Sequence, residues 1–151
     1  MRLSIAAIGR AGQSPEHALV ERYFSRLPYQ GTMIEREASK QSGIAGKRDE
    51  GKRLLSALPD GCKLIVLDEN GTNLSSVKWA DQISNWRDSG TRDAVFAIGG
   101  ADGHSDEVLA AADKTFAFGA QTWPHMLVRA MLAEQLYRAE MILARHPYHH
   151  A

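Results

Sequence analysis

The sequence predicts an α/β fold whose mostly parallel sheet is flanked by helices, and two observations carry this prediction. Short apolar runs of the kind found in strands covered on both faces recur along the chain. Segments whose apolar residues fall at helical spacing separate these runs, and such alternation is typical of parallel sheets. The chain has 151 residues, 44% hydrophobic and 24% charged, which suits one globular domain over residues 1–151.

The first part of the chain predicts two strands around one helix. Residues 2–9 form an apolar run that ends in glycine. The Ser-Pro-Glu motif at 14–16 then provides a helix cap, a first-turn proline and an early acidic residue. We expect this helix to end before Pro28, and the alternating residues 32–37 to form a second strand.

The polar segment 40–53 leads into a leucine-rich stretch, so its second half predicts an amphipathic helix. Its basic side chains have two open interpretations, as a solvated helix face or as a surface that contacts phosphate. These side chains are Lys40, Lys47, Arg48, Lys52 and Arg53, with Asp49 and Glu50 between them.

The second half of the chain predicts three buried central strands, at 63–68, 94–100 and 114–119. Helices are predicted between and after them, at 75–87, 104–113 and 124–145. Trp79 and Trp86 are seven residues apart on the first of these helices. We interpret them as packing residues rather than as a platform for nucleic-acid bases.

Composition limits the kind of protein this chain can be. Lysine plus arginine equals aspartate plus glutamate, 18 each, so the formal net charge is zero. This balance disfavours avid binding of naked nucleic acid by a single copy of the chain. The lone Cys62 has no disulfide partner, which suits a reducing cytoplasm, and we interpret it as a small apolar residue at a strand entrance. No apolar stretch approaches the roughly 20 residues that span a bilayer.

Ligands of parallel sheets bind beyond the carboxyl ends of the strands, and three unusual loops follow strands here. They read ENGTNLSS at 69–76, ADGHSDE at 101–107 and AQTWPH at 120–125. Two consecutive glycines at 99–100 let the backbone approach a ligand closely. These features indicate a nucleotide-like ligand. The motifs of Rossmann folds, P-loops, nucleophile elbows and zinc sites are not present.

Four segments together resemble one family. LDENGTNLSS at 67–76, FAIGGADG at 96–103, TWPHMLVRAMLAEQLYRAEMI at 122–142 and HPYHH at 146–150 are similar to the bacterial ribosomal RNA large-subunit methyltransferase H family, of the SPOUT class. The resemblance runs over the whole chain.

The resemblance implies a C-terminal deep trefoil knot and a cytoplasmic homodimer that binds S-adenosylmethionine. It also implies methylation of the N3 atom of a pseudouridine in 23S ribosomal RNA. The target would lie in a stem-loop at the ribosomal subunit interface, within the assembled ribosome.

Carried over residue by residue, the resemblance implies a set of cofactor-binding positions. Leu67 would flank the adenine, and Gly100 would leave room for the cofactor. The loop after the last strand departs from the family pattern at Phe118-Gly119, where Leu-Ser is usual. The implied positions are Leu67, Gly100, Gly119, Ala120, Gln121, Thr122, Trp123 and Pro124.

The implied catalytic residues are Tyr148, His149 and Arg138. The imide-like N3 of pseudouridine carries a proton at neutral pH, so a group must remove the proton or stabilise the resulting anion. Arg129 lies on the same predicted helix as Arg138 and is a second candidate source of positive charge.

Structural alternatives accompany several of these candidates. We interpret His104 as a solvated loop residue rather than a base, and His125 as a capping or packing residue. Tyr137 and Arg138 also suit a dimer interface, and Glu134 is placed to pair with Arg138 four residues later.

The histidines of the tail predict no metal site. Pro147 interrupts the helical spacing of His146 and His149, and no nearby carboxylate or thiol completes a ligand set.

Two other functions remain open at this point. One is a catalytically silent module that binds RNA or ribosomes with the same fold. The other is an α/β enzyme that uses a different nucleotide. Binding of S-adenosylmethionine separates both from a methyltransferase.

Overall fold

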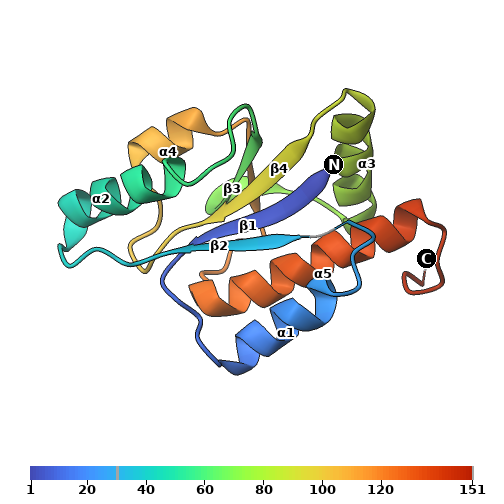
Figure 1. Ribbon diagram of the computed structural model, residues 1–151, viewed down its shortest axis with the longest axis horizontal. Coiled ribbons are helices and arrows are strands. Elements are labelled where there is room, and N and C mark those ends of the chain that lie inside the picture. The colour runs from blue at the N-terminus through green and yellow to red at the C-terminus, as the bar shows by residue number, and fades with distance from the viewer. Residues whose placement is uncertain (30, 151) are drawn as a thin grey trace.

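The computed structural model describes residues 1–29 and 31–150, in which strands and helices alternate as predicted (Figure 1). The α/β fold class is therefore confirmed. The elements in chain order are β1 (Arg2–Ile8), α1 (Pro15–Phe24), β2 (Thr32–Arg36), α2 (Gly43–Leu55), β3 (Lys63–Asn73), α3 (Ser76–Asp88), β4 (Asp93–Ile98), α4 (Asp106–Ala111), β5 (Lys114–Ala117) and α5 (His125–Leu143).

The strands form one five-stranded sheet in the order β2-β1-β4-β3-β5. Every neighbouring pair is parallel, with Ile5 of β1 and Ile65 of β3 both in register with Phe96 of β4. Because all strands point the same way, the loops after β3, β4 and β5 leave the sheet at one edge, its carboxyl edge.

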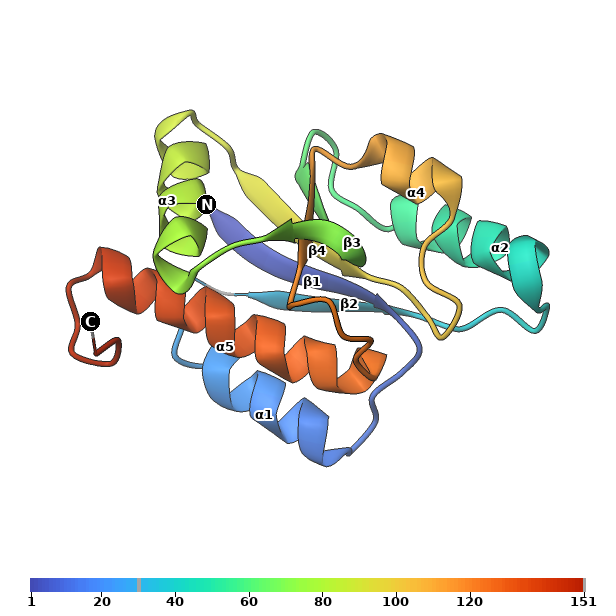
Figure 2. The same ribbon diagram turned by 180° about the vertical axis from the view of Figure 1, so that it is seen from behind.

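Helices cover both faces of the sheet. Helices α1, α3 and α5 pack on one face, and α2 and α4 pack on the other (Figures 1 and 2). Along β1, Leu3 and Ile5 belong to the core under the first group, whereas Ala6 and Ile8 belong to the core under the second. Alternate side chains of a strand point to opposite faces, so a strand covered on both faces reads as a continuous apolar run.

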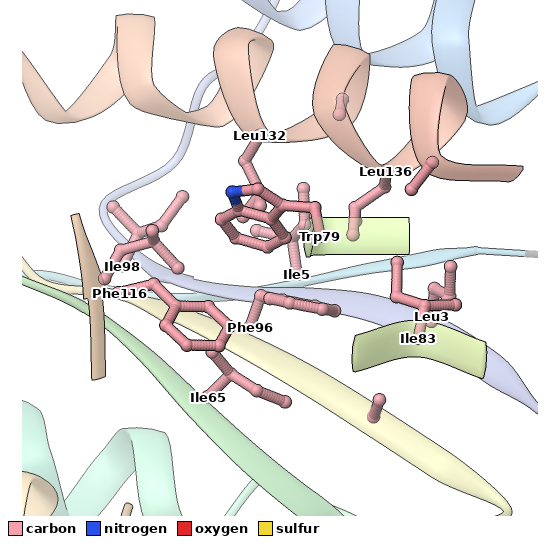
Figure 3. Packing of buried hydrophobic residues seen from close by; sticks show 14 of the residues in the cluster. Leu3, Ile5, Ile65, Trp79, Ile83, Phe96, Ile98, Phe116, Leu132 and Leu136 are labelled. Atoms are coloured by element: carbon pink, nitrogen blue, oxygen red, sulfur yellow. The ribbon is translucent and has the colours of Figure 1, made fainter. Parts of the chain in front are cut away.

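The larger core is organised around Trp79 of α3. Its side chain is 1% exposed, and its ring lies edge-on to Phe116 with centroids 5.0 Å apart. Leu132 and Leu136 of α5 lie above this ring, and Phe96 lies beneath it (Figure 3). Trp86 is also buried, so both tryptophans are packing residues, as the sequence predicts.

Strand β3 is longer than predicted. The sequence places its end at Asp68, but the strand continues to Asn73. After a shift in register, Thr72 and Asn73 pair with Phe116 and Ala117 of β5. This extension depends on a partner strand more than 40 residues away, which no local pattern in the segment ENGTN reveals.

Other boundaries differ by a few residues, as expected for frayed helix ends. Helix α1 ends at Phe24, and the chain turns before it reaches Pro28. Helix α5 ends at Leu143 and β5 at Ala117, each two residues earlier than predicted.

Cys62 is half-buried and packs against the core beneath α2 and α4. Burial raises the pKa of its thiol, with the carboxylates of Asp93 and Asp113 adding to the effect. The thiol form is therefore favoured, and Cys62 acts as a small apolar residue at the start of β3. Of the helices that the structure describes, none is long and apolar enough to cross a membrane.

The backbone of β5 passes directly against Gly71. A Cβ atom built on Gly71 would lie 2.6 Å from the carbonyl carbon of Phe116 and 2.8 Å from its Cα. These are backbone atoms of a buried strand, so they have little freedom to move. The close crossing of the two segments therefore requires glycine at this position. The trefoil knot itself stays a prediction of the family resemblance.

We expect Gly71→Ala to lower the free energy of unfolding by about 2 kcal/mol, the usual scale of overpacking in a well-packed core. Urea denaturation of the two proteins measures this difference. Thr72→Ala is the matched control, because Thr72 is exposed on the same segment. Equal stability of Gly71→Ala and the parent chain would contradict the close crossing.

Candidate active site

A cavity of about 490 Å³ lies at the carboxyl edge of the sheet. Its walls are the part of β3 from Leu67 to Asn70, the ends of β4 and β5 with the loops that follow them, residues of α2 and α4, and the first turn of α5. A space of this size is typical of small-molecule sites, and its position is the one that the three unusual loops predict. We call it the edge pocket.

Six of the eight implied cofactor-binding residues line the edge pocket. They are Leu67, Gly100, Gly119, Gln121, Thr122 and Trp123. Ala120 and Pro124 lie in the same loop between β5 and α5 but are not among the lining residues. The structure therefore brings three separate motifs of the sequence to one cavity.

The loop after β5 is tied to the extension of β3 by two hydrogen bonds. The backbone N–H of Gly119 donates to Oδ1 of Asn73 at 2.8 Å, and the hydroxyl of Thr122 donates to Oε2 of Glu69 at 2.9 Å. Asn73 and Glu69 were not predicted as site residues. Both lie in the segment 69–76 that the sequence marks as unusual, but their hydrogen bonds depend on β5 and the loop after it, which no local pattern reveals.

Gly100 packs closely against two side chains of the protein. A Cβ atom built on it would lie 2.8 Å from Oε2 of Glu50 and 3.2 Å from Cγ2 of Ile8. The missing side chain therefore makes room for these two residues. The backbone of Gly100 still lines the edge pocket.

The lining of the edge pocket combines apolar and acidic groups. Ile98, Phe116 and Val128 join Leu67 as apolar walls. The lining has one ammonium group, that of Lys47. It has four carboxylates, those of Asp68, Glu69, Asp102 and Asp106. The apolar surface suits a flat heterocycle, and the excess of carboxylates suits a ligand with cationic groups.

His104 is buried, which corrects its prediction as a solvated loop residue. It is 8% exposed, and its Nε2 lies 3.2 Å from the carbonyl oxygen of Leu67. Burial lowers the pKa of the imidazole, and the nearby Lys47 lowers it further. The carboxylate of Asp68 and hydrogen bonds to backbone carbonyls raise the pKa, but by less than burial lowers it. The sequence could not show this, because the fold returns the loop after β4 to the end of β3.

His125 lines the edge pocket half-buried, at the start of α5. Pro124 occupies the cap position of this helix, so His125 packs rather than caps. Burial lowers the pKa of its ring, and the charge of Arg129 acts in the same direction.

Arg129 does not reach a substrate, contrary to its prediction as a source of charge for phosphate or an oxyanion. Its side chain is 1% exposed and points into the protein. It donates to the carbonyl oxygens of Ile8 at 2.7 Å and Gly9 at 2.9 Å, and to Oε1 of Glu35 at 2.8 Å. These acceptors balance the positive charge of Arg129 inside the protein, so the guanidinium is not free to bind a phosphate.

The three implied catalytic residues come together near the C-terminal end of α5. Nε of Arg138 donates to Oε1 of Glu134 at 2.9 Å, which confirms the predicted pair. The guanidinium carbon of Arg138 lies 4.8 Å from the ring centroid of Tyr148, and its Nη1 lies 3.5 Å from Nδ1 of His149. The hydroxyl of Tyr148 donates to Oε1 of Glu134 at 3.0 Å. We call these four residues the tail cluster.

Protonation states in the tail cluster follow from these contacts. Burial raises the pKa of the Tyr148 phenol, and hydrogen bonds with Tyr23 and Glu134 add to the effect. The hydrogen bond with Glu134 raises the pKa of Arg138. At neutral pH the phenol is therefore uncharged and the guanidinium is positive.

The first turn of α5 and the C-terminal tail lie at opposite ends of this helix (Figures 1 and 2). The edge pocket contacts the first turn, and the tail cluster lies at the other end. Val128 lines the pocket, and Arg138 follows ten residues later on the same helix. At 1.5 Å per residue this separation is about 15 Å along the helix axis. No residue beyond Val128 lines the pocket in the described part of the chain.

The basic cluster of residues 40–53 is partly neutralised. Arg53 pairs with Asp49 at 2.6 Å, and Arg48 approaches Glu107 at 3.3 Å. Lys47 instead lines the edge pocket. Within residues 1–29 and 31–150, no three His, Cys, Asp or Glu side chains gather as a metal site would require.

A family model and relatives similar in sequence place this chain in the same family. The family model described as "Predicted SPOUT methyltransferase" matches residues 1–149. A protein of Hyphomonas neptunium named ribosomal RNA large subunit methyltransferase H is 50% identical over the full length of both chains. Proteins of the same name from Rhodospirillum centenum and Paramagnetospirillum magneticum are 51% and 49% identical, over 100% and 99% of both chains.

A solved structure, a probable methylase family protein from Haemophilus influenzae, shares the fold. Its TM-score is 0.55 at 10% identity, and the match covers 99% of this chain and 70% of that one.

We expect Arg129→Met to lower the free energy of unfolding by about 3 kcal/mol, because it removes the donor to the carbonyls of Ile8 and Gly9 and the charged partner of Glu35. Chemical denaturation measures the change. Arg22→Met is the control, since Arg22 is exposed in the last turn of α1. A loss no larger than that of the control would contradict a structural role for Arg129.

Acidification should destabilise the protein through His104. Its lowered pKa means that the unfolded chain binds a proton below about pH 6.5 that the folded chain resists. Stability is thus complete above that pH and falls as the pH drops below it. His104→Gln, which does not titrate, should lose less stability between pH 7 and pH 5. Parallel curves in denaturant titrations at each pH would contradict this expectation.

Proposed function

Because this chain belongs to the SPOUT methyltransferase family, we propose that it transfers a methyl group from S-adenosylmethionine to N3 of a pseudouridine in 23S ribosomal RNA. The relatives that it matches over their full length carry the name ribosomal RNA large subunit methyltransferase H. The target in the stem-loop at the ribosomal subunit interface follows from the same resemblance, as does a cytoplasmic location.

One observation carries the proposal, the meeting of three family motifs in the edge pocket. Leu67 lies within β3, Gly100 follows β4, and the lining residues Gly119, Gln121, Thr122 and Trp123 follow β5. Apolar walls fit the adenine ring, and the excess of carboxylates fits the sulfonium and ammonium groups of S-adenosylmethionine. Exposed backbone groups of the loop after β5 are available to the adenine edge.

S-adenosylmethionine supplies an activated methyl group, so the protein has to position the acceptor nitrogen and favour its deprotonated form. Arg138 is charged at neutral pH and lies in the tail cluster beside His149. Arginine only donates hydrogen bonds, so its contact with Nδ1 places the proton of a neutral His149 on Nε2. The guanidinium of Arg138 and the imidazole N–H of His149 are therefore close enough to stabilise the anion of the imide together.

Tyr148 has a different part in this proposal. Its raised pKa keeps the phenol protonated, so it is not the group that removes the N3 proton. It donates to Glu134 and packs edge-on against Tyr137, with ring centroids 4.8 Å apart. Tyr148 thereby holds the tail against α5 and fixes the position of His149.

The separation of the two sites supports a homodimer. About 15 Å of helix lie between the edge pocket and Arg138, so the tail cluster does not face the pocket of its own chain. A two-fold arrangement of two copies brings the tail of each to the pocket of the other. In this arrangement each active site consists of one pocket and the partner's tail.

The direct test of function is methylation of ribosomes that lack the modification. Purified protein, S-adenosylmethionine and assembled ribosomes from a strain without this gene should yield one added methyl group on a pseudouridine of 23S RNA. Mass spectrometry of RNA fragments locates the group. Methylation of naked RNA but not of ribosomes would contradict the proposed substrate. Failure of the protein to bind S-adenosylmethionine would instead favour a silent binding module.

His149→Ala should reduce turnover by about 100-fold or more, the scale of lost acid–base or anion stabilisation. Its affinity for S-adenosylmethionine should not change, because the lining of the edge pocket binds the cofactor and His149 acts on the acceptor nitrogen. Single-turnover methylation and calorimetric titration measure the two quantities. The neighbouring His150→Ala is the control and should retain activity. Normal turnover of His149→Ala would remove His149 from the mechanism.

A further inference from the structure

His104 is the one buried histidine in the wall of the edge pocket that the proposed chemistry does not use. Its ring is 8% exposed, and its Nε2 lies 3.2 Å from the carbonyl oxygen of Leu67. A carbonyl only accepts hydrogen bonds, so Nε2 carries a hydrogen and donates it. The contact joins the loop after β4 to the middle of β3, where the β3–β5 register breaks.

A tight turn of glycines places His104 in this position. The N–H of Gly103 donates to the carbonyl of Gly100 at 3.1 Å, and Gly103 has a positive φ of 78°. A Cβ atom built on Gly99 would lie 2.8 Å from the carbonyl carbon of Gly103, so the turn closes on itself without room for a side chain. Ser105 follows directly and caps α4. His104 is thus held between a closed turn and a capped helix.

Leu67 is the point where β3 leaves its regular pairing. It is in register with Ile98 of β4 and Phe116 of β5, but the β3–β5 register breaks between Leu67 and Thr72. A buried carbonyl at the end of a ladder needs a donor from elsewhere. The His104 imidazole supplies it, and the side chain of Leu67 then lies fixed as part of the pocket wall.

We propose that His104 is a positioning residue for the cofactor. By donating to the Leu67 carbonyl, it holds two walls of the edge pocket, β3 at Leu67 and the loop after β4, at a constant separation. This inference rests on the proposed function, because it assumes that S-adenosylmethionine is the molecule bound between these walls. His104 acts through Leu67 and takes no part in methyl transfer.

The test compares His104→Leu with His104→Gln in calorimetric titration with S-adenosylmethionine. Leucine fills similar space without a donor, and we expect it to raise the Kd by about 3- to 10-fold, the usual value of one hydrogen bond. The glutamine amide reaches as far as Nε2 and should restore the Kd to within about twofold of the parent. In methylation assays, KM for S-adenosylmethionine should rise in His104→Leu while kcat stays within about twofold.

Asp113→Ala is the matched control. Its carboxylate accepts from the backbone N–H of Leu64 at 2.7 Å, so it also fixes β3, but at the end away from the pocket. This variant should lose thermal stability and keep the parent Kd. If leucine prevents folding, His104→Asn serves instead, because its amide is too short to reach Leu67.

Three results would overturn the positioning role. The first is an unchanged Kd in folded His104→Leu, and the second is a glutamine variant as weak as the leucine variant. A rise in Kd in Asp113→Ala equal to that in His104→Leu would also overturn it, since general loss of stability would then suffice. If the parent protein itself does not bind S-adenosylmethionine, the proposed function fails first, and this is seen before any substitution is compared.

Discussion

The buried side chain of Arg129 links α5 to the carboxyl edge of the sheet, and the geometry of the edge pocket depends on this link. From one turn of α5 it reaches the carbonyls at the end of β1 and the carboxylate of Glu35 on β2. Glu35 also accepts from the N–H of Ala11, so the loop after β1 joins the same group. A charge this deeply buried is tolerable only with such partners, which restricts α5 to one position.

The neighbours of Arg129 on α5 explain why this restriction matters. His125 lies one turn earlier, Val128 lies beside it, and both line the edge pocket. Glycines meet the opposite requirement, because they stand where segments must approach more closely than a side chain allows. Gly71 admits the backbone of β5, and Gly100 admits Glu50 and Ile8. The buried cation thus fixes the helix beside the edge pocket, and the two glycines allow the neighbouring segments to approach closely.

Much of the fold could be predicted from the sequence, because each buried strand is a continuous apolar run and each helix has caps or apolar spacing. The Glu134–Arg138 pair follows from helical spacing in the same way. Features that depend on distant segments could not be predicted. The extension of β3 requires β5, the burial of His104 requires the end of β3, and the internal role of Arg129 requires β1 and β2. The expectation that Arg138 acts together with the tail rests on the family resemblance alone.

The central claim is that each active site combines the edge pocket of one copy with the tail of another. Mixing two inactive variants tests it most directly: Gly100→Val, whose side chain would collide with Glu50 and Ile8 at the pocket wall, and His149→Ala in the tail. After subunit exchange, half of the dimers are mixed and each has one intact site, so the account predicts about a quarter of parental methylation. Mixed dimers that form but stay as inactive as either variant would contradict it.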